Sequence, residues 1–402
     1  MRNFSNGPVL LSLLGLFCSA ISCSDTIDQG TDQPAPPAEP VPPAEPAPPA
    51  DARIEWDPQS RMVQVPSTSG CDSWTPTWAP DGNLYTAFGD CRPDGVPRKI
   101  GMGFGRISGD AGYGVSFTVV PTGNPDDWDD AASGVGVEAV GDGPESEKPA
   151  GMLHAGGRLW YWIRNISAVG TGVRLKFSDN YDSATPMFTW VDWSLPEIGY
   201  ASFVQYGQGY TDGPADYVYA VIPMSSSASG GVSNSAYDLV PGFSLIRGSR
   251  IDLTLETNWE YFCGSASSPA WCNSAAIASP IFFEPDTKFT PRAGMSWNAG
   301  LGKFMLSLVY DPTPATLNEG TRFHGGLMVL VSSQPWGPWQ TVFTSDNLSW
   351  PGGTSSAACG ATDWGSGERA DIPTRYMSPD GKTFYLFSSG GDCLSIARGV
   401  MR

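Results

Sequence analysis

Histidine and basic residues are scarce in this chain. Only two of its 402 residues, His154 and His324, are histidines, and no metal-ligand spacing surrounds either of them. A histidine-rich zinc site is therefore not expected, and no metal or other cofactor is predicted. The chain has 23 lysines and arginines and 41 acidic residues, which gives a formal net charge of −18. This balance argues against nucleic acid and against a basic membrane-binding face, and it favours a neutral partner.

Helical patterns and long apolar runs are also lacking. No long stretch places apolar residues at helical spacing, which argues against a helical domain. The apolar run Val9–Phe17 is far shorter than the roughly 20 residues that cross a bilayer. Because Arg2 precedes this run and small residues follow it, residues 1–23 are predicted to be a secretion signal.

The signal ends in Ala20-Ile21-Ser22-Cys23. This sequence is similar to the lipobox of bacterial lipoproteins, although Leu is commoner where Ala20 stands. Lipidation is therefore predicted at Cys23, with a lipid anchor in the membrane, and an ordinary cleaved signal is the alternative. The expected location is the cell envelope, as an outer-membrane or surface lipoprotein, or outside the cell.

A segment rich in Pro, Ala and Glu follows the signal over residues 24–52, with the quasi-repeat PAPPAEPVPPAEPAPPAD. Such a composition cannot bury enough apolar area to offset chain entropy, so a disordered, extended and solvated stalk is predicted. No second linker interrupts residues 53–402. They are predicted to form one domain and to act as a monomer.

The cysteines predict disulfide bonds rather than catalytic thiols, because none lies in a C-x-x-C motif. An even number in an exported chain indicates a disulfide framework, and pairing of sequence neighbours would close three short or moderate loops. Other connectivities stay open. Apart from Cys18 and Cys23, the cysteines are Cys71, Cys91, Cys263, Cys272, Cys359 and Cys393.

One pattern recurs along the domain: a turn that contains Gly, followed by a strand of alternating aromatic or aliphatic residues. Each occurrence is predicted to be a hairpin, because Gly supplies the positive φ of the turn. Five hairpins fit an all-β fold, a five-bladed β-propeller, with a two-sheet sandwich as the alternative. The segments cover residues 76–90, 151–165, 212–223, 296–310 and 376–390.

The chain resembles a bacterial family of unknown function over residues 60–400. The resemblance is carried by GCDSWTPTWAPDGNLYTAFGDC, EKPAGMLHAGGRLWYWIRN, FSDNYDSATPMFTWVDW, SFVQYGQGYTDGPADYVYAV, SLIRGSRI, SSQPWGPWQTVFTSDN and MSPDGKTFYLFSSGG. That family adopts a five-bladed propeller akin to arabinan-active glycoside hydrolases, and some members are endo-D-arabinanases. The resemblance therefore implies the same fold and suggests activity on a polysaccharide.

Glycoside cleavage requires two carboxyl groups, one as acid and one as nucleophile or base. Asp72 and Asp90 lie at the two ends of the first predicted hairpin, so antiparallel pairing allows them to approach each other. A disulfide between the adjacent Cys71 and Cys91 would hold that arrangement. Two apposed carboxylates raise the pKa of one of them, as a general acid requires. The alternative is that both residues only stabilise turns.

The second predicted hairpin carries further candidates. The resemblance places Glu147 near the channel, where it is a candidate acid, and Lys148 beside it is a candidate for binding substrate. Arg164 and Asn165 end the strand WYWIRN, where an arginine can hydrogen-bond sugar hydroxyls or neutralise an acidic cluster. Surface charge and a structural ion pair are the alternatives for these residues.

The last candidates rest on the resemblance and on aromatic content. Asp216 matches the family's Asp before a YVY strand, and Arg292 matches a family arginine, but neutral AGMSW stands where a carboxylate is expected after it. Trp74 is a candidate sugar platform, with core packing as the alternative. The arginine triad that a sialidase needs is not evident in the sequence.

The sequence thus predicts a cell-surface glycoside hydrolase that acts on a complex polysaccharide. The catalytic set is Asp72, Asp90 and Glu147, and the substrate-binding set is Trp74, Lys148, Arg164, Asn165, Asp216 and Arg292. A non-catalytic carbohydrate-binding or adhesion propeller is the alternative.

Overall fold

The computed structural model describes residues 52–56, 63–68, 70–91, 100–112, 114–122, 147–167, 170–226, 231–311, 326–345, 369–389 and 393–402. All of them belong to the unit formed by residues 46–402. The predicted signal, lipobox and stalk lie outside the described residues. Among the residues that are described, no helix is long and apolar enough to cross a membrane.

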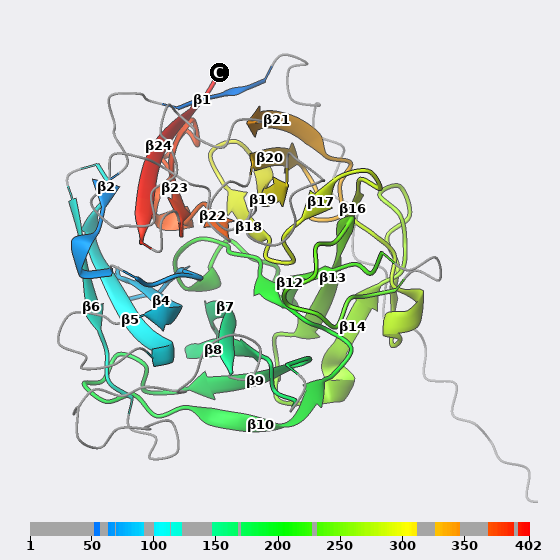
Figure 1. Ribbon diagram of the computed structural model, residues 1–402, viewed down its shortest axis with the longest axis horizontal. Coiled ribbons are helices and arrows are strands. Elements are labelled where there is room, and N and C mark those ends of the chain that lie inside the picture. Colours follow the sequence, from blue (N-terminus) through cyan, green and yellow to red (C-terminus); the bar gives the residue numbers. More distant parts are fainter. Residues whose placement is uncertain are drawn as a thin grey trace, which may run out of the picture. The chain divides into compact units, whose positions relative to one another are not determined.

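The described strands form five antiparallel sheets arranged as the blades of a β-propeller (Figure 1). Blade one contains β3 (Thr77–Trp78), β4 (Leu84–Cys91), β5 (Ile100–Asp110) and β6 (Gly114–Val119). Blade two contains β7 (Lys148–Ala155), β8 (Arg158–Arg164), β9 (Val173–Ser178) and β10 (Thr189–Leu195). Blade three contains β11 (Ser202–Phe203), β12 (Tyr217–Pro223), β13 (Gly242–Ser249), β14 (Trp259–Phe262), β15 (Trp271–Cys272) and β16 (Phe282–Phe283).

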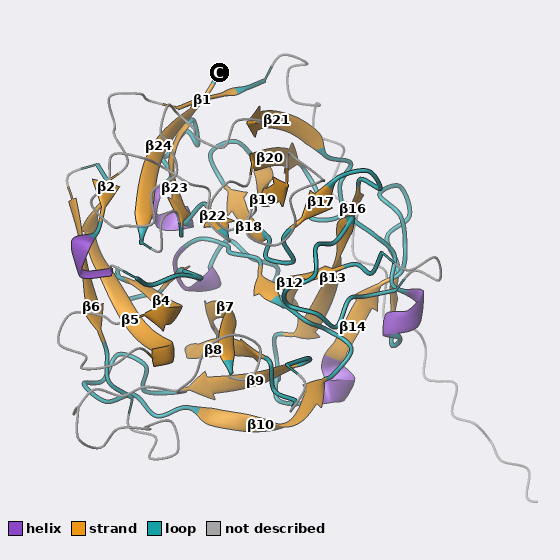
Figure 2. Ribbon diagram, in the orientation of Figure 1, coloured by secondary structure: helices purple, strands orange, loops and turns teal. Residues whose placement is uncertain are grey.

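The remaining strands complete the ring. Blade four contains β17 (Lys288–Phe289), β18 (Gly294–Asn298), β19 (Lys303–Asp311), β20 (Gly326–Ser332) and β21 (Gln340–Ser345). Blade five contains β22 (Ala370–Asp371), β23 (Thr383–Ser388), β24 (Ser395–Met401), β1 (Ile54–Trp56) and β2 (Val63–Gln64). The helices drawn in Figure 2 are short 3₁₀ turns: η1 (Pro66–Thr68), η4 (Gln208–Tyr210), η5 (Glu256–Asn258), η6 (Ala275–Ile277) and η7 (Thr374–Tyr376).

The five recurring segments of the sequence each supply the second strand of a different blade, namely β4, β8, β12, β19 and β23. In three blades the first strand belongs to the same tight hairpin, and Gly82, Gly157 and Gly302 of these turns have positive φ values. In blades three and five the first strand lies further back along the chain. The predicted propeller is confirmed, and the sandwich is excluded.

The two ends of the domain meet in blade five. Strand β1 pairs antiparallel with β24, so that Ile54 lies opposite Met401 and Trp56 opposite Gly399. The first strand of the domain is thus hydrogen-bonded to the last. This pairing closes the ring, because it joins the N-terminal strand of the domain to the C-terminal blade.

Apolar residues fill the spaces between neighbouring blades. Trp162 of β8, for example, packs against Trp259 of β14 with ring centroids 5.1 Å apart. Trp74 packs against Phe88 and Phe117 within blade one and is 1% exposed. Because core side chains enclose its ring, the core-packing alternative is favoured for Trp74 over the predicted sugar platform.

The cysteines follow the disulfide prediction only in part. Cys71 and Cys393 each take part in a disulfide bond, whereas Cys263 and Cys272 are free thiols. Cys272 lies opposite Tyr261, so Cys263 is its diagonal neighbour, and diagonal Cα atoms are about 7–8 Å apart. The two thiols interact through a hydrogen bond and are not bridged in this structure. The side chains of Cys91 and Cys359 lie outside the described part.

Candidate functional site

Charged side chains gather where the innermost strands of the blades begin. We call this group the axial cluster. In Figure 1 the innermost strands of blades two, four and five, β7, β18 and β22, lie next to the middle of the ring. The axial cluster consists of Asp72, Lys148, Arg164, Tyr200, Tyr237, Arg292, Arg369 and Asp371.

Arg369 crosses the propeller axis. It precedes β22 of blade five, and its Nη1 donates to the carbonyl of Ala150 in blade two at 2.8 Å and to Ser202 Oγ in blade three at 2.8 Å. The same nitrogen donates to Tyr200 Oη at 3.1 Å. Blades two and three do not adjoin blade five in the ring (Figure 1). Arg369 therefore ties opposite sides of the propeller together.

Asp371 provides the counter-charge for Arg369. Nη2 of Arg369 donates to Oδ1 of Asp371 at 2.9 Å, and its Nε donates to Oδ2. Burial raises the pKa of Asp371, and the Arg369 guanidinium opposes that shift. A buried bidentate pair of this kind is expected where a positive charge must be held away from water.

Asp72 is a buried carboxylate at the same end of blade one. Its backbone forms an isolated antiparallel bridge with Gly89 in β4. A Cβ atom on Gly89 would stand 3.2 Å from Asp72 Oδ1 and 3.4 Å from Pro149 Cδ of blade two. Asp72 also interacts electrostatically with Arg292. Its carboxylate thus lies where blade one meets blade two, with an arginine nearby.

Lys148 of β7 and Arg164 of β8 are cross-strand neighbours in blade two. They are directly opposite in the pairing of β7 with β8, which puts their side chains on the same face. Lys148 is fully buried and Arg164 is 2% exposed. Nε of Arg164 donates to the carbonyl of Pro149 at 3.1 Å. Glu147, just before β7, is half-buried. The second predicted hairpin therefore supplies basic side chains to the axial cluster and has an acidic residue beside it.

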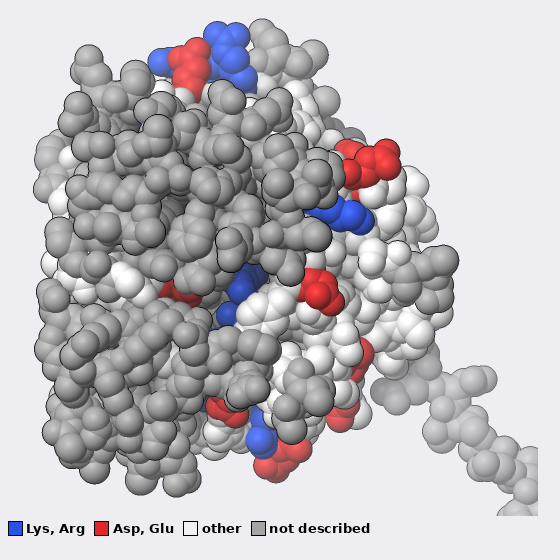
Figure 3. Space-filling view, viewed as in Figure 1, with Lys and Arg blue, Asp and Glu red and all other residues white. Residues whose placement is uncertain are grey.

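Three arginines surround Tyr200. The guanidinium carbons of Arg164, Arg292 and Arg369 lie 5.6, 6.0 and 5.7 Å from its ring centroid. Arg164 and Arg292 also lie 5.1 and 5.9 Å from the ring centroid of Tyr237. This triad could not be predicted from local sequence, because its members are more than 70 positions apart. Basic side chains are visible near the centre of the face shown in Figure 3.

Two residues beside the axial cluster have an unusual backbone. Ser73 and Asn165 adopt φ values of 59° and 61°, and they directly follow Asp72 and Arg164. Such conformations are uncommon for residues other than Gly and collect at functional sites. Asn165 Nδ2 donates to Tyr237 Oη at 2.7 Å, which links the turn to the tyrosine.

The structure separates one predicted residue from the others. Asp216 is exposed and precedes β12, whereas the end of that strand, at Val221, pairs with Ser202 near the axis. Five strand residues span about 16 Å, so Asp216 lies at the far end of blade three. The structure therefore does not bring Asp216 to the axial cluster, and its role in binding substrate stays a prediction. Asp90 follows Gly89, and its side chain lies outside the described part.

Sequence reasoning missed Tyr200, Tyr237, Arg369 and Asp371. The segment GERADIP carried a usable signal, because an Arg and an Asp two positions apart at a strand start point to the same face. The tyrosines carried none, since nothing local distinguishes them from core aromatics. Among the residues described, no group of three or more His, Cys, Asp or Glu is placed to hold a metal ion.

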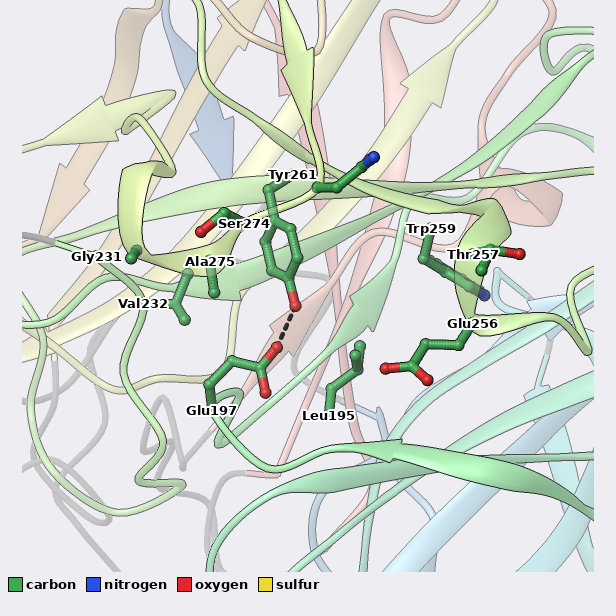
Figure 4. Close-up of a pocket in the computed structure, with 12 residues that line it drawn as sticks. Leu195, Glu197, Gly231, Val232, Glu256, Thr257, Trp259, Tyr261, Ser274 and Ala275 are labelled. Carbon is green, nitrogen blue, oxygen red and sulfur yellow. Dashed lines mark hydrogen bonds between the residues drawn. The ribbon is translucent and has the colours of Figure 1, made fainter. Parts of the chain in front are cut away.

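A cavity of about 680 Å³ lies away from the axis, between the outer strands of blades two and three. Figure 4 shows Glu197 and Glu256 in its wall, on either side of Leu195. The Tyr261 hydroxyl donates to Glu197, and burial together with that carboxylate raises the pKa of Tyr261. Among the described residues that line the cavity, the charged ones are acidic.

No family model matches the chain, and no curated protein matches it. Similar solved structures include a GH43_1 enzyme from Xanthomonas citri, with 11% identity, a TM-score of 0.43 and coverage of 85% of this chain and 91% of that one. The native arabinanase of Bacillus subtilis shows 13% identity and a TM-score of 0.40, covering 82% and 96%. A family 117 glycoside hydrolase from Zobellia galactanivorans shows 9% and 0.41, covering 88% and 91%. These values concern the fold alone, so activity is argued from the site.

Proposed function

We propose that this protein is a glycoside hydrolase of the cell envelope, anchored through Cys23, that cleaves a complex polysaccharide such as an arabinofuranose-containing one. The observation that carries the proposal is the buried carboxylate of Asp72 at the axis, next to blade two and under the influence of Arg292. A buried carboxylate that lies at the axis beside an arginine is suited to act as nucleophile or base.

Glu147 is the proposed acid. It lies at the start of β7, where the innermost strand of blade two reaches the axial cluster, and it is half-buried. Asp90, one residue beyond the Gly89 partner of Asp72, remains the other candidate for this role. Asp371 is not assigned to the reaction, because both of its oxygens accept hydrogen bonds from Arg369.

A carbohydrate-binding or adhesion propeller is the second candidate. It is favoured by the neutral β18, whose sequence GMSWN carries no carboxylate to the axis. In such a protein the axial cluster would hold a glycan without turnover, and the cross-axis contacts of Arg369 would serve only stability.

The test is release of reducing sugar and product size with the purified protein on a panel led by arabinans and arabinogalactan. Asp72→Asn is expected to lower turnover by about 10²–10⁴-fold, because an amide cannot replace the proposed catalytic carboxyl group. Asp179→Asn is the matched control, since Asp179 is an exposed carboxylate paired with Arg158 at 2.6 Å. Equal rates for the two variants, or saturable binding with no release by the parent protein, would reject the hydrolase.

A further inference from the structure

Arg164 and Arg292 form a buried pair of like charges within the axial cluster. They are 2% and 5% exposed, and both guanidinium groups lie within 6 Å of the ring centroids of Tyr200 and Tyr237. Burial, and next the charge of Arg164, lower the pKa of Arg292 to about 10. Two guanidinium groups so placed repel each other, and the repulsion is weakly screened away from water.

The three arginines around Tyr200 differ in how their charge is compensated. Arg369 has the bidentate partner Asp371, and Arg292 has Asp72 in its surroundings. Arg164 donates through Nε to a neutral carbonyl, and within the described chain its buried Nη1 has no hydrogen-bond acceptor. A buried donor without an acceptor lowers the free energy of unfolding unless a ligand accepts its hydrogen bond.

Tyr237 connects this pair to solvent. It is 38% exposed, although its ring lies 5.1 Å from the Arg164 guanidinium carbon. Its hydroxyl oxygen accepts a hydrogen bond from Asn165, which leaves the hydroxyl proton available for donation to a ligand. Tyr237 is thus the side chain through which a ligand would meet this buried pair.

We propose that Arg164 and Arg292 bind the carboxylate of an acidic sugar, so that the glycan recognised at the axial cluster carries uronic or sialic acid units. This inference rests on the proposed function only in taking the axial cluster as the glycan site. The planar fork of a guanidinium matches both oxygens of a carboxylate, whereas a sugar hydroxyl offers no charge.

The net charge of the protein gives this site its selectivity. At a formal charge of −18, the protein repels a polyanion in general, so an acidic glycan gains attraction only where cations are concentrated. The cavity between blades two and three, which displays Glu197 and Glu256, disfavours the same ligand. Binding is therefore localised to the axis.

The first experiment uses the full-length wild-type protein and matched ligand pairs in calorimetric titrations. Sodium galacturonate is compared with galactose, and sodium N-acetylneuraminate with its methyl ester, so that the two pairs distinguish the two sources of carboxylate. At least one acid is expected to bind at least tenfold more tightly than its neutral counterpart. Equal binding of acid and neutral ligand in both pairs, or no binding of either acid, would overturn the inference.

The second experiment measures Arg164→Gln against Arg158→Gln, an exposed arginine that pairs with Asp179. The first variant is expected to lose at least tenfold of the preference for the acid, and the second to keep it. If Arg164→Gln fails to fold, the wild-type ligand pairs still decide. Cleavage of neutral arabinan without acid preference would reject this inference and leave the hydrolase standing. Acid preference without cleavage of any glycan would support this inference and reject the hydrolase.

Discussion

The two ends of strand β7 bury ionisable side chains in opposite ways. At its start, Lys148 is fully buried opposite Arg164, in a cluster that also holds Asp72 and Asp371. Near its end, His154 lies 5.0 Å from the ring of Tyr181, and burial lowers its pKa. A group buried among aromatic rings is kept neutral, whereas charge persists in the interior where opposite charges or a ligand compensate it.

The largest expected effect is at the charged end. Arg369→Gln leaves Asp371 buried without its counter-charge and removes the contacts to blades two and three. We expect a loss of about 3–5 kcal/mol in the free energy of unfolding, measured by urea denaturation. Arg158→Gln, at an exposed pair, is expected to cost less than about 1 kcal/mol. Similar losses in both variants would mean that the cross-axis contacts contribute little.

A smaller effect is expected from crowding the same end. A Cβ atom on Gly294 of β18 would stand 2.4 Å from the carbonyl oxygen of Ala370 and 2.7 Å from Asp371 Oδ1. Gly294→Ala is expected to lower the free energy of unfolding by about 1–3 kcal/mol, because blades four and five must separate. Thermal denaturation measures the loss. An unchanged midpoint would show that the two blades adapt to the extra methyl group.

The smallest effect concerns His154 and depends on pH. Because the folded-state pKa lies below the usual 6.5, the unfolded chain takes up the proton first as pH falls. Stability is therefore complete above about 6.5 and declines below it, with a slope of at most about 1.4 kcal/mol per pH unit for one proton. Urea midpoints between pH 5 and 8 measure this slope.

Substitution of the two histidines identifies the source of that slope. His154→Gln should flatten the decline, whereas His324→Gln should leave it in place. The reverse result would assign the titration to His324 and would remove the contrast between the two ends of β7.

Much of the fold could be predicted from local patterns. The glycine turns and the alternating strands after them identified the second strand of every blade, because both features depend on neighbouring residues. The first strands of blades three and five were not predicted. β11 and β22 are each two residues long, and such short strands carry no alternation to detect.

The candidate site was predicted less completely. Asp72, Lys148, Arg164 and Arg292 do lie together, because strand starts converge at one end of a propeller. Asp216 lies apart from them because it precedes a second strand, which runs in the opposite direction to the innermost one. Trp74 is packed in the core, and its local sequence does not distinguish it from an aromatic residue near a site.

The sequence by itself determined the number of blades, the turns between strands and the acidic charge of the chain, since these follow from residue type and short spacing. Only the tertiary structure decided which charges meet. Arg369 and Ser202, hydrogen-bonded across the axis, are 167 positions apart, and no local pattern records that distance. Closure of the ring brings such residues together, and the cost of burying charge then favours a carboxylate beside an arginine, as Asp371 lies beside Arg369.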